Sequence, residues 1–148
     1  GGKRLQAIAA WLPHYDIDPK KIRMLGTGRW DVAGLGAEPA MVGGWYAAPA
    51  PEERARFVRQ YKEIYGKKPH RLATLAYDAT ALAAVLAKSG HRFDTTQITA
   101  PQGFSGRDGI FRFLPEGITQ RGLAVLQVFE RDTRTISRAP EGFARRTK

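Results

Sequence analysis

Apolar residues recur along this chain with helical spacing in some segments and in short extended runs in others. A spacing of 3.6 residues predicts a short amphipathic helix over residues 3–12. Short apolar runs bounded by glycine predict strands over residues 22–26 and 41–47, with a loop and a helical turn over 30–38 between them. The first third of the chain is therefore expected to interleave helix and strand.

Two longer helices are expected in the middle of the chain. The first begins near Pro51, with Glu52 and Glu53 in its first turn where the helix dipole favours acids, and ends at Gly66, a natural left-handed cap. The second spans residues 71–88. Thirteen of the 16 residues from 72 to 87 are apolar, and seven of these are Ala, which predicts a helix that is buried on most of its sides.

The last third of the chain changes to turns and short extended runs. A short helix is expected over residues 95–100 and a turn-rich loop over 104–109. The pattern then predicts three strands, over residues 110–114, 123–130 and 135–138, arranged as a β-meander or as a pair of hairpins. The order of elements predicts an α/β class with C-terminal antiparallel strands. The few early strands indicate an incomplete sheet, which a second copy in a homodimer could complete by edge pairing.

The chain is strongly basic, but its charge is spread along the sequence. The 148 residues contain 24 Lys and Arg against 14 Asp and Glu, a formal net charge of +10 at pH 7. Residues 1–30 carry +4, 31–90 carry +2, 91–118 carry 0 and 119–148 carry +4. Nucleic-acid-binding proteins usually gather their cations on one stripe, because each neutralised phosphate adds affinity. We therefore favour a charge that aids solubility or attraction to an anionic surface. A basic nucleic-acid-binding module is the alternative.

The residue types of catalytic and metal sites do not form the usual patterns in this sequence. The absence of Cys excludes disulfides and thiolate metal sites, and the three histidines, His14, His70 and His91, are isolated. Motifs for a nucleophilic serine or a phosphate loop are also missing. These observations predict a protein that is not an enzyme, with no catalytic residue, no metal and no cofactor.

A few residues still stand out as candidates for binding. Asp78 is the only acid in the apolar helix, so it is either a group with a perturbed environment or, as we favour, a carboxylate that caps a nearby helix or bonds backbone amides. Trp30, Trp45 and Tyr46 lie near glycines at the ends of predicted strands. Large aromatic side chains in such places either wall a ligand cleft or fill the core.

Several segments, taken together in their order and spacing, resemble one family. They are 25–31 (LGTGRWD), 43–49 (GGWYAAP), 65–66 (YG), 76–79 (AYDA), 104–113 (FSGRDGIFRF) and 121–125 (RGLAV). The series is similar to the C-terminal part of type 1 periplasmic solute-binding proteins, the leucine and branched-chain amino-acid-binding group of ABC transporters. Segments 45–49 and 121–125 most resemble the penicillin-binding protein activator lipoproteins.

The resemblance implies part of a fold with two Rossmann-like lobes joined by a hinge. Residues 1–66 would be an α/β segment of the second lobe. Residues 67–148 would be a crossover helix and C-terminal strands that rejoin the hinge and the first lobe. A chain that starts without Met fits a piece of a longer protein, whose preceding segment would carry a lipid anchor.

The resemblance also implies a function and a set of site residues. The protein would be a non-enzymatic periplasmic domain that binds a small polar ligand, such as an amino acid, for transport through a membrane permease. Alternatively, it would dock a penicillin-binding protein in cell-wall synthesis. Tyr77 and Asp78 match the family's Tyr-Asp-Ala segment, and Trp30 and Tyr46 match loops that face the cleft. These four residues are therefore the predicted ligand-binding residues.

Overall fold

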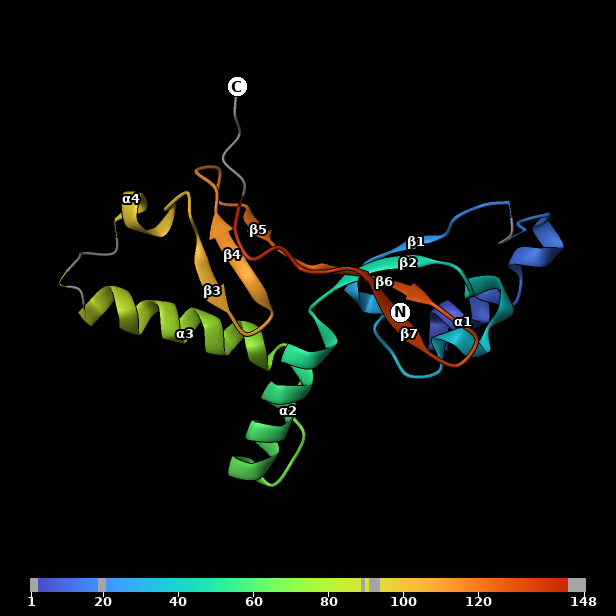
Figure 1. The fold of residues 1–148 in the computed structure, drawn as a ribbon, viewed down its shortest axis with the longest axis horizontal. Coiled ribbons are helices and arrows are strands. Elements are labelled where there is room, and N and C mark those ends of the chain that lie inside the picture. Colours follow the sequence, from blue (N-terminus) through green and yellow to red (C-terminus); the bar gives the residue numbers. More distant parts are fainter. Residues whose placement is uncertain (1–2, 19–20, 89, 91–93, 144–148) are drawn as a thin grey trace. The chain divides into compact units, whose positions relative to one another are not determined.

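The computed structural model in Figure 1 describes residues 3–18, 21–88, 90 and 94–143 of the chain. The chain divides into two compact units. Unit 1 consists of residues 1–48 and 124–138, and unit 2 consists of residues 49–123 and 139–148. The chain therefore passes between the units three times. The boundary that was expected between residues 66 and 67 lies inside unit 2, and the assignment of residues to lobes stays a prediction.

Unit 1 is built on a mixed sheet with the strand order β1-β2-β6-β7. Its strands are β1 (Leu25–Gly26), β2 (Trp45–Ala48), β6 (Ala124–Val128) and β7 (Thr133–Ser137). β1 pairs with β2 in parallel, and the other neighbours are antiparallel. Every second residue of β6 is buried, beginning with Ala124, so one face of this central strand points into the core.

Short helical segments precede β1 and connect β1 to β2. They are α1 (Lys3–Ala9) and the 3₁₀ turns η1 (Leu12–Tyr15), η2 (Gly28–Trp30), η3 (Leu35–Ala37) and η4 (Pro39–Met41). The largest fully buried side chains come from these turns and from β2 and β6: Leu35, Met41, Tyr46, Leu126 and Val128. Both early strands are shorter than expected. β2 starts only at Trp45, because Pro39 begins a 3₁₀ turn and Gly43, with a φ of 84°, interrupts the extended run.

Unit 2 combines helices with a sheet of strand order β3-β4-β5. Its elements are α2 (Pro51–Tyr65), α3 (Ala73–Lys88), α4 (Thr95–Ile98), β3 (Phe104–Gly106), β4 (Gly109–Phe113) and β5 (Thr119–Arg121). The expected limits of α2 are confirmed. Pro51 begins the helix, and Gly66 ends it at a φ of 68°, with its N–H donating to the Lys62 carbonyl at 2.8 Å. Within the described residues, no helix is both long and apolar enough to cross a bilayer.

The expectation that α3 is buried on most sides is wrong. Its buried residues are Thr74, Asp78 and Leu86, whereas Leu75 and Val85 are 41% and 63% exposed. Within unit 2, α3 contacts β3 and the turn that follows it, and this contact covers one face of the helix. The prediction failed because most of the apolar residues in this helix are alanines, and alanine is compatible with both a buried and an exposed helix face.

Of the two arrangements expected for the C-terminal strands, they form hairpins in two separate sheets and not a single meander. Residues 104–109, predicted as a loop, form β3, a two-residue turn and the start of β4, with Gly106 opposite Gly109. Gly109 has a φ of 96°, which explains why a glycine-rich segment forms a tight hairpin here. β6 and β7 then leave this sheet, and β6 pairs with β2 of unit 1 instead.

Candidate functional site

Trp30 and Tyr46 lie together in the interior of unit 1. Trp30 is 8% exposed and Tyr46 is 2% exposed, and their ring centroids are 6.3 Å apart at an interplanar angle of 46°. The structure therefore brings these two predicted ligand-binding residues into contact with each other and gives both a packing role in the core. Direct contact of either side chain with a ligand stays a prediction.

The glycines that flank these aromatics provide space for the Trp30 indole. A Cβ atom at Gly44 would lie 2.9 Å from the Trp30 ring, and one at Gly26 would overlap the same ring. Any larger residue at these positions would displace the indole from its place against the sheet. The packing of Trp30 therefore explains the glycines at positions 26 and 44 of these two segments.

The buried Tyr46 gives unit 1 an alkaline pH dependence. Burial raises the pKa of Tyr46 above 10.0, against a smaller lowering by a hydrogen bond with the Thr133 side chain. The unfolded chain therefore loses this proton at a lower pH than the folded chain. We expect the free energy of unfolding to be unaffected by this group below pH 10.0 and to fall as the pH rises towards the pKa of the folded form.

This dependence can be measured by urea unfolding at a series of pH values from neutral to alkaline. Tryptophan fluorescence reports the unfolding, and the urea midpoint is compared between pH values. Tyr46→Phe should remove the part of the alkaline slope that belongs to this group. Tyr15→Phe is the matched control, because Tyr15 is 71% exposed. Equal alkaline slopes for wild type and Tyr46→Phe would contradict the expectation.

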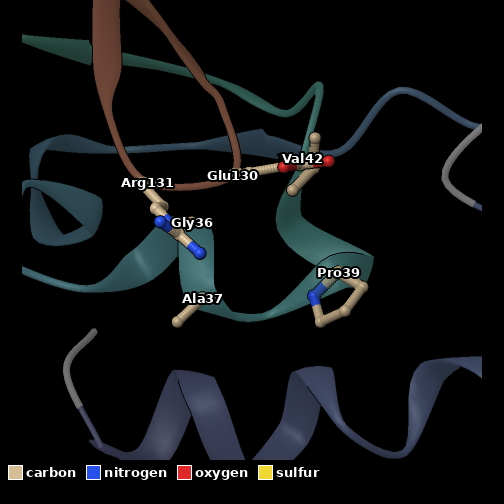
Figure 2. Close-up of a pocket in the computed structure, with 6 residues that line it drawn as sticks. All are labelled: Gly36, Ala37, Pro39, Val42, Glu130 and Arg131. Carbon is tan, nitrogen blue, oxygen red and sulfur yellow. The ribbon is translucent and has the colours of Figure 1, made fainter.

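Unit 1 also contains an open hollow of about 450 Å³. Figure 2 shows its walls, which come from the η3 and η4 turns and from the turn between β6 and β7: Gly36, Ala37, Pro39, Val42, Glu130 and Arg131. Gly36 lies tightly against the β6–β7 turn, since a Cβ there would come within 3.0 Å of the Glu130 carbonyl group. None of the four predicted site residues lines this hollow.

Asp78 joins α3 to the β3–β4 hairpin of unit 2. Its Oδ1 accepts a hydrogen bond from the Arg107 backbone N–H at 2.8 Å, and its Oδ2 pairs with Arg121 Nη1 at 3.4 Å. The Asp78 side chain is 3% exposed. A Cβ at Gly106 would press on this carboxyl group, so the close approach needs glycine. The expectation that Asp78 bonds a backbone amide is confirmed, and its role toward a ligand stays a prediction.

A second buried contact lies beside the first on the same helix. Thr74 Oγ1 donates to Asp108 Oδ2 at 2.6 Å, and both residues are buried. Asp108 Oδ1 has no hydrogen-bond partner among the described residues. Thr74 and Asp78 are one helical turn apart, so one face of α3 holds both residues of the turn between β3 and β4.

Tyr77 lies next to this polar contact but is open to solvent. It is 46% exposed, and the Arg107 guanidinium lies 4.8 Å from its ring centroid and donates to its hydroxyl at 3.0 Å. The Phe57 ring packs edge-on against the Tyr77 ring, with the two ring centroids 6.0 Å apart. Tyr77 and Arg107 therefore combine an aromatic surface and a cation at one exposed position.

These two residues line an open pocket of about 340 Å³ in unit 2. Along α2, Phe57 contacts Tyr61 at 6.0 Å and Tyr61 contacts Tyr65 at 4.5 Å between ring centroids, so aromatic rings form one wall. The lining also holds one cation, Arg107, and one acid, Glu63, so the pocket offers an apolar wall together with a charged partner for a carboxylate and one for an ammonium group. We take this pocket, the Tyr77 pocket, as the candidate ligand site.

Of the four predicted ligand-binding residues, only Tyr77 lines this pocket. The i, i+4 spacing of Phe57, Tyr61 and Tyr65 was a usable signal for a shared aromatic face. Arg107 carried no signal of its own, because its position depends on a hairpin that was expected to be a loop. For metals, the described residues contain no group of three or more side chains that could hold an ion, and His91 lies outside the described residues.

The mixed α/β architecture is that of the type 1 periplasmic-binding-protein fold, present in part. No protein-family model matches the chain, and no curated protein matches it. Solved structures do match it, and they carry the same fold. The chain therefore resembles the leucine and branched-chain amino-acid-binding group of solute-binding proteins, as its sequence predicted.

Three of these structures illustrate the likeness. A "putative branched-chain amino acid ABC transporter" from Rhodospirillum rubrum is 26% identical over 78% of this chain and 37% of its own, with a TM-score of 0.59. The leucine binding protein LivK from Thermotoga maritima is 22% identical over 90% of this chain and 41% of its own, with a TM-score of 0.55. A solute binding protein from R. palustris in complex with benzoate is 18% identical over 93% of this chain and 42% of its own, with a TM-score of 0.51. The chain thus spans less than half the length of each.

Proposed function

We propose that this chain is part of a non-enzymatic, extracytoplasmic solute-binding protein that captures a small organic solute for a membrane permease. The observation that carries this proposal is the match to the Rhodospirillum rubrum protein, which combines a common fold with 26% identity over 78% of the chain. Neighbours named as leucine-binding, or solved in complex with Leu, support the same class. We further propose a periplasmic location.

The domain organisation fits the same proposal. The chain passes between units 1 and 2 three times, so each unit is assembled from separate stretches of sequence. We propose that the two units are portions of the two lobes of the longer fold. The expected division at residue 66 would then be replaced by divisions after residues 48, 123 and 138.

For the ligand, we propose a small carboxylate with an apolar body, bound in the Tyr77 pocket. Leucine and benzoate, the ligands named for two of the neighbours, both have this chemistry. Arg107 would pair with the carboxylate, and the rings of Phe57 and Tyr61 would contact the apolar body. Asp78 would act through Arg107, whose backbone N–H it holds at 2.8 Å.

The test is titration calorimetry of the chain with L-leucine, L-isoleucine and benzoate. We expect saturable binding of at least one of them and a loss of affinity of roughly 10- to 100-fold in Arg107→Gln, since a charge-assisted hydrogen bond contributes roughly 1.5–3 kcal/mol. Arg56→Gln on α2 is the control, because it removes the same charge away from this pocket.

Two results would contradict the proposal. Binding that is equally strong in Arg107→Gln would place the ligand elsewhere. The absence of binding across the panel, together with capture of a purified penicillin-binding protein, would favour the activator function over solute transport.

A further inference from the structure

The segment that joins α2 to α3 exposes apolar and basic side chains together. We call residues 62–72 the α2–α3 tip (Figure 1). Within it, only Pro69 is partly covered, and every other residue is exposed. Ile64, Tyr65 and Leu72 are 72%, 60% and 55% exposed. The tip therefore exposes three large apolar side chains within nine residues.

The same segment concentrates positive charge. It contains four cations, Lys62, Lys67, Lys68 and Arg71, against the single acid Glu63, a net charge of +3 with histidine neutral. Within the described part of the chain, Lys62, Lys67 and Lys68 form no ion pair. Their ammonium groups are therefore available to an anionic partner.

The tip is held in one conformation by backbone hydrogen bonds at both of its ends. The Gly66 N–H donates to the Lys62 carbonyl at 2.8 Å, and the Ala73 N–H donates to the His70 carbonyl at 2.9 Å. The Leu72 N–H also donates to Nδ1 of His70 at 3.3 Å. A partner that binds the tip therefore has less chain entropy to overcome than it would with an unstructured loop.

We propose that the α2–α3 tip docks on an anionic lipid surface. The lysines would lie among the phosphate headgroups, while Ile64, Tyr65 and Leu72 would enter the interface between headgroups and acyl chains. The negative surface potential attracts the lysines, and the amphipathic Tyr65 ring suits the layer between headgroups and acyl chains. The backbone phosphates of a nucleic acid would engage the lysines but would leave the three apolar side chains in water. Ile64 and Tyr65 also line the Tyr77 pocket, so vesicle binding is measured without added solute and tests the docking separately from the proposed function.

The first test measures co-sedimentation of the chain with vesicles of phosphatidylcholine alone or with about 30 mol% phosphatidylglycerol. We expect binding only to the anionic vesicles, weakened by salt. Lys67→Gln/Lys68→Gln should reduce the partition coefficient by roughly 30-fold, because each lysine near such a surface contributes about 1 kcal/mol. Arg56→Gln/Arg59→Gln removes the same charge from the middle of α2, outside the tip, and should have a clearly smaller effect.

The second test separates insertion from simple charge attraction. Ile64→Ser/Leu72→Ser keeps every charge, and we expect it to reduce vesicle binding at least fivefold at low and high salt alike, since less apolar area is buried. Circular dichroism checks that these surface variants keep their helices. The proposal fails if this variant binds vesicles like wild type, or if the lysine double variant and the arginine double variant lose equal affinity for vesicles. It also fails if duplex DNA binds through Lys67 and Lys68 as tightly as the anionic vesicles do.

Discussion

Replacing Asp78 by alanine should destabilise unit 2 by about 3 kcal/mol, because it leaves two donors without their acceptor. The Arg107 backbone N–H would lose a 2.8 Å hydrogen bond, and the Arg121 guanidinium, whose side chain is only 19% exposed, would lose its carboxylate. Removing one partner of a buried pair costs more than the pair contributes, since the remaining charge stays desolvated. The β3–β4 hairpin would then be held to α3 chiefly by Thr74 and Asp108.

The effect can be assigned to unit 2 by the choice of signal. The helices α2 and α3 belong to unit 2, whereas all three tryptophans, Trp11, Trp30 and Trp45, belong to unit 1. Urea unfolding followed by helical circular dichroism should therefore respond more strongly than tryptophan fluorescence. Asp78→Asn is the matched variant, because its amide oxygen can still accept from the Arg107 N–H. A loss in Asp78→Ala no larger than in Asp78→Asn would indicate that the backbone bond from Arg107 does not help to anchor the hairpin.

Leu126→Ala should destabilise unit 1 by about 3 kcal/mol. Leu126 is 1% exposed in β6, between β2 and β7, so truncation would leave a cavity in the centre of the sheet's buried face. The loss should be visible in tryptophan fluorescence during urea unfolding, since Trp30 belongs to the same core. Thr135→Ala is the control, because Thr135 lies opposite Leu126 on β7 and is exposed. A shift that is no larger for Leu126→Ala than for Thr135→Ala would contradict the described core.

The features that the sequence predicted correctly depend on neighbouring residues. The start of α2 at Pro51 and its end at Gly66 follow from local conformational preferences, which operate whatever the rest of the chain does. The β3–β4 hairpin was missed because its glycines have two explanations. They break an extended run, but Gly106 also admits the Asp78 carboxyl group and Gly109 permits the tight turn. Only the partner helix distinguishes these explanations.

The candidate site was predictable only in part for the same reason. The sequence marked Asp78 and its preference for backbone amides, but the identity of the amide depends on residues 29 positions away. Trp30 and Tyr46 were marked as large aromatics near glycines, and both the cleft and the core were open explanations until their burial was known. Arg107 gained its place over Tyr77 through the hairpin, so no local pattern could have identified it.

The discontinuous assembly of unit 1 has a consequence for proteolysis. β2 ends the first stretch of unit 1, and β6 begins the second stretch, after residues 49–123 of unit 2. These two strands pair with each other. The pairing runs from Trp45 opposite Gln127 to Ala48 opposite Ala124, and the Trp45 indole N–H adds a 3.1 Å bond to the Gln127 side chain. A nick in the link between β2 and α2 would cut the backbone without separating these strands. The two fragments should therefore migrate as one particle under native conditions and come apart only in denaturant.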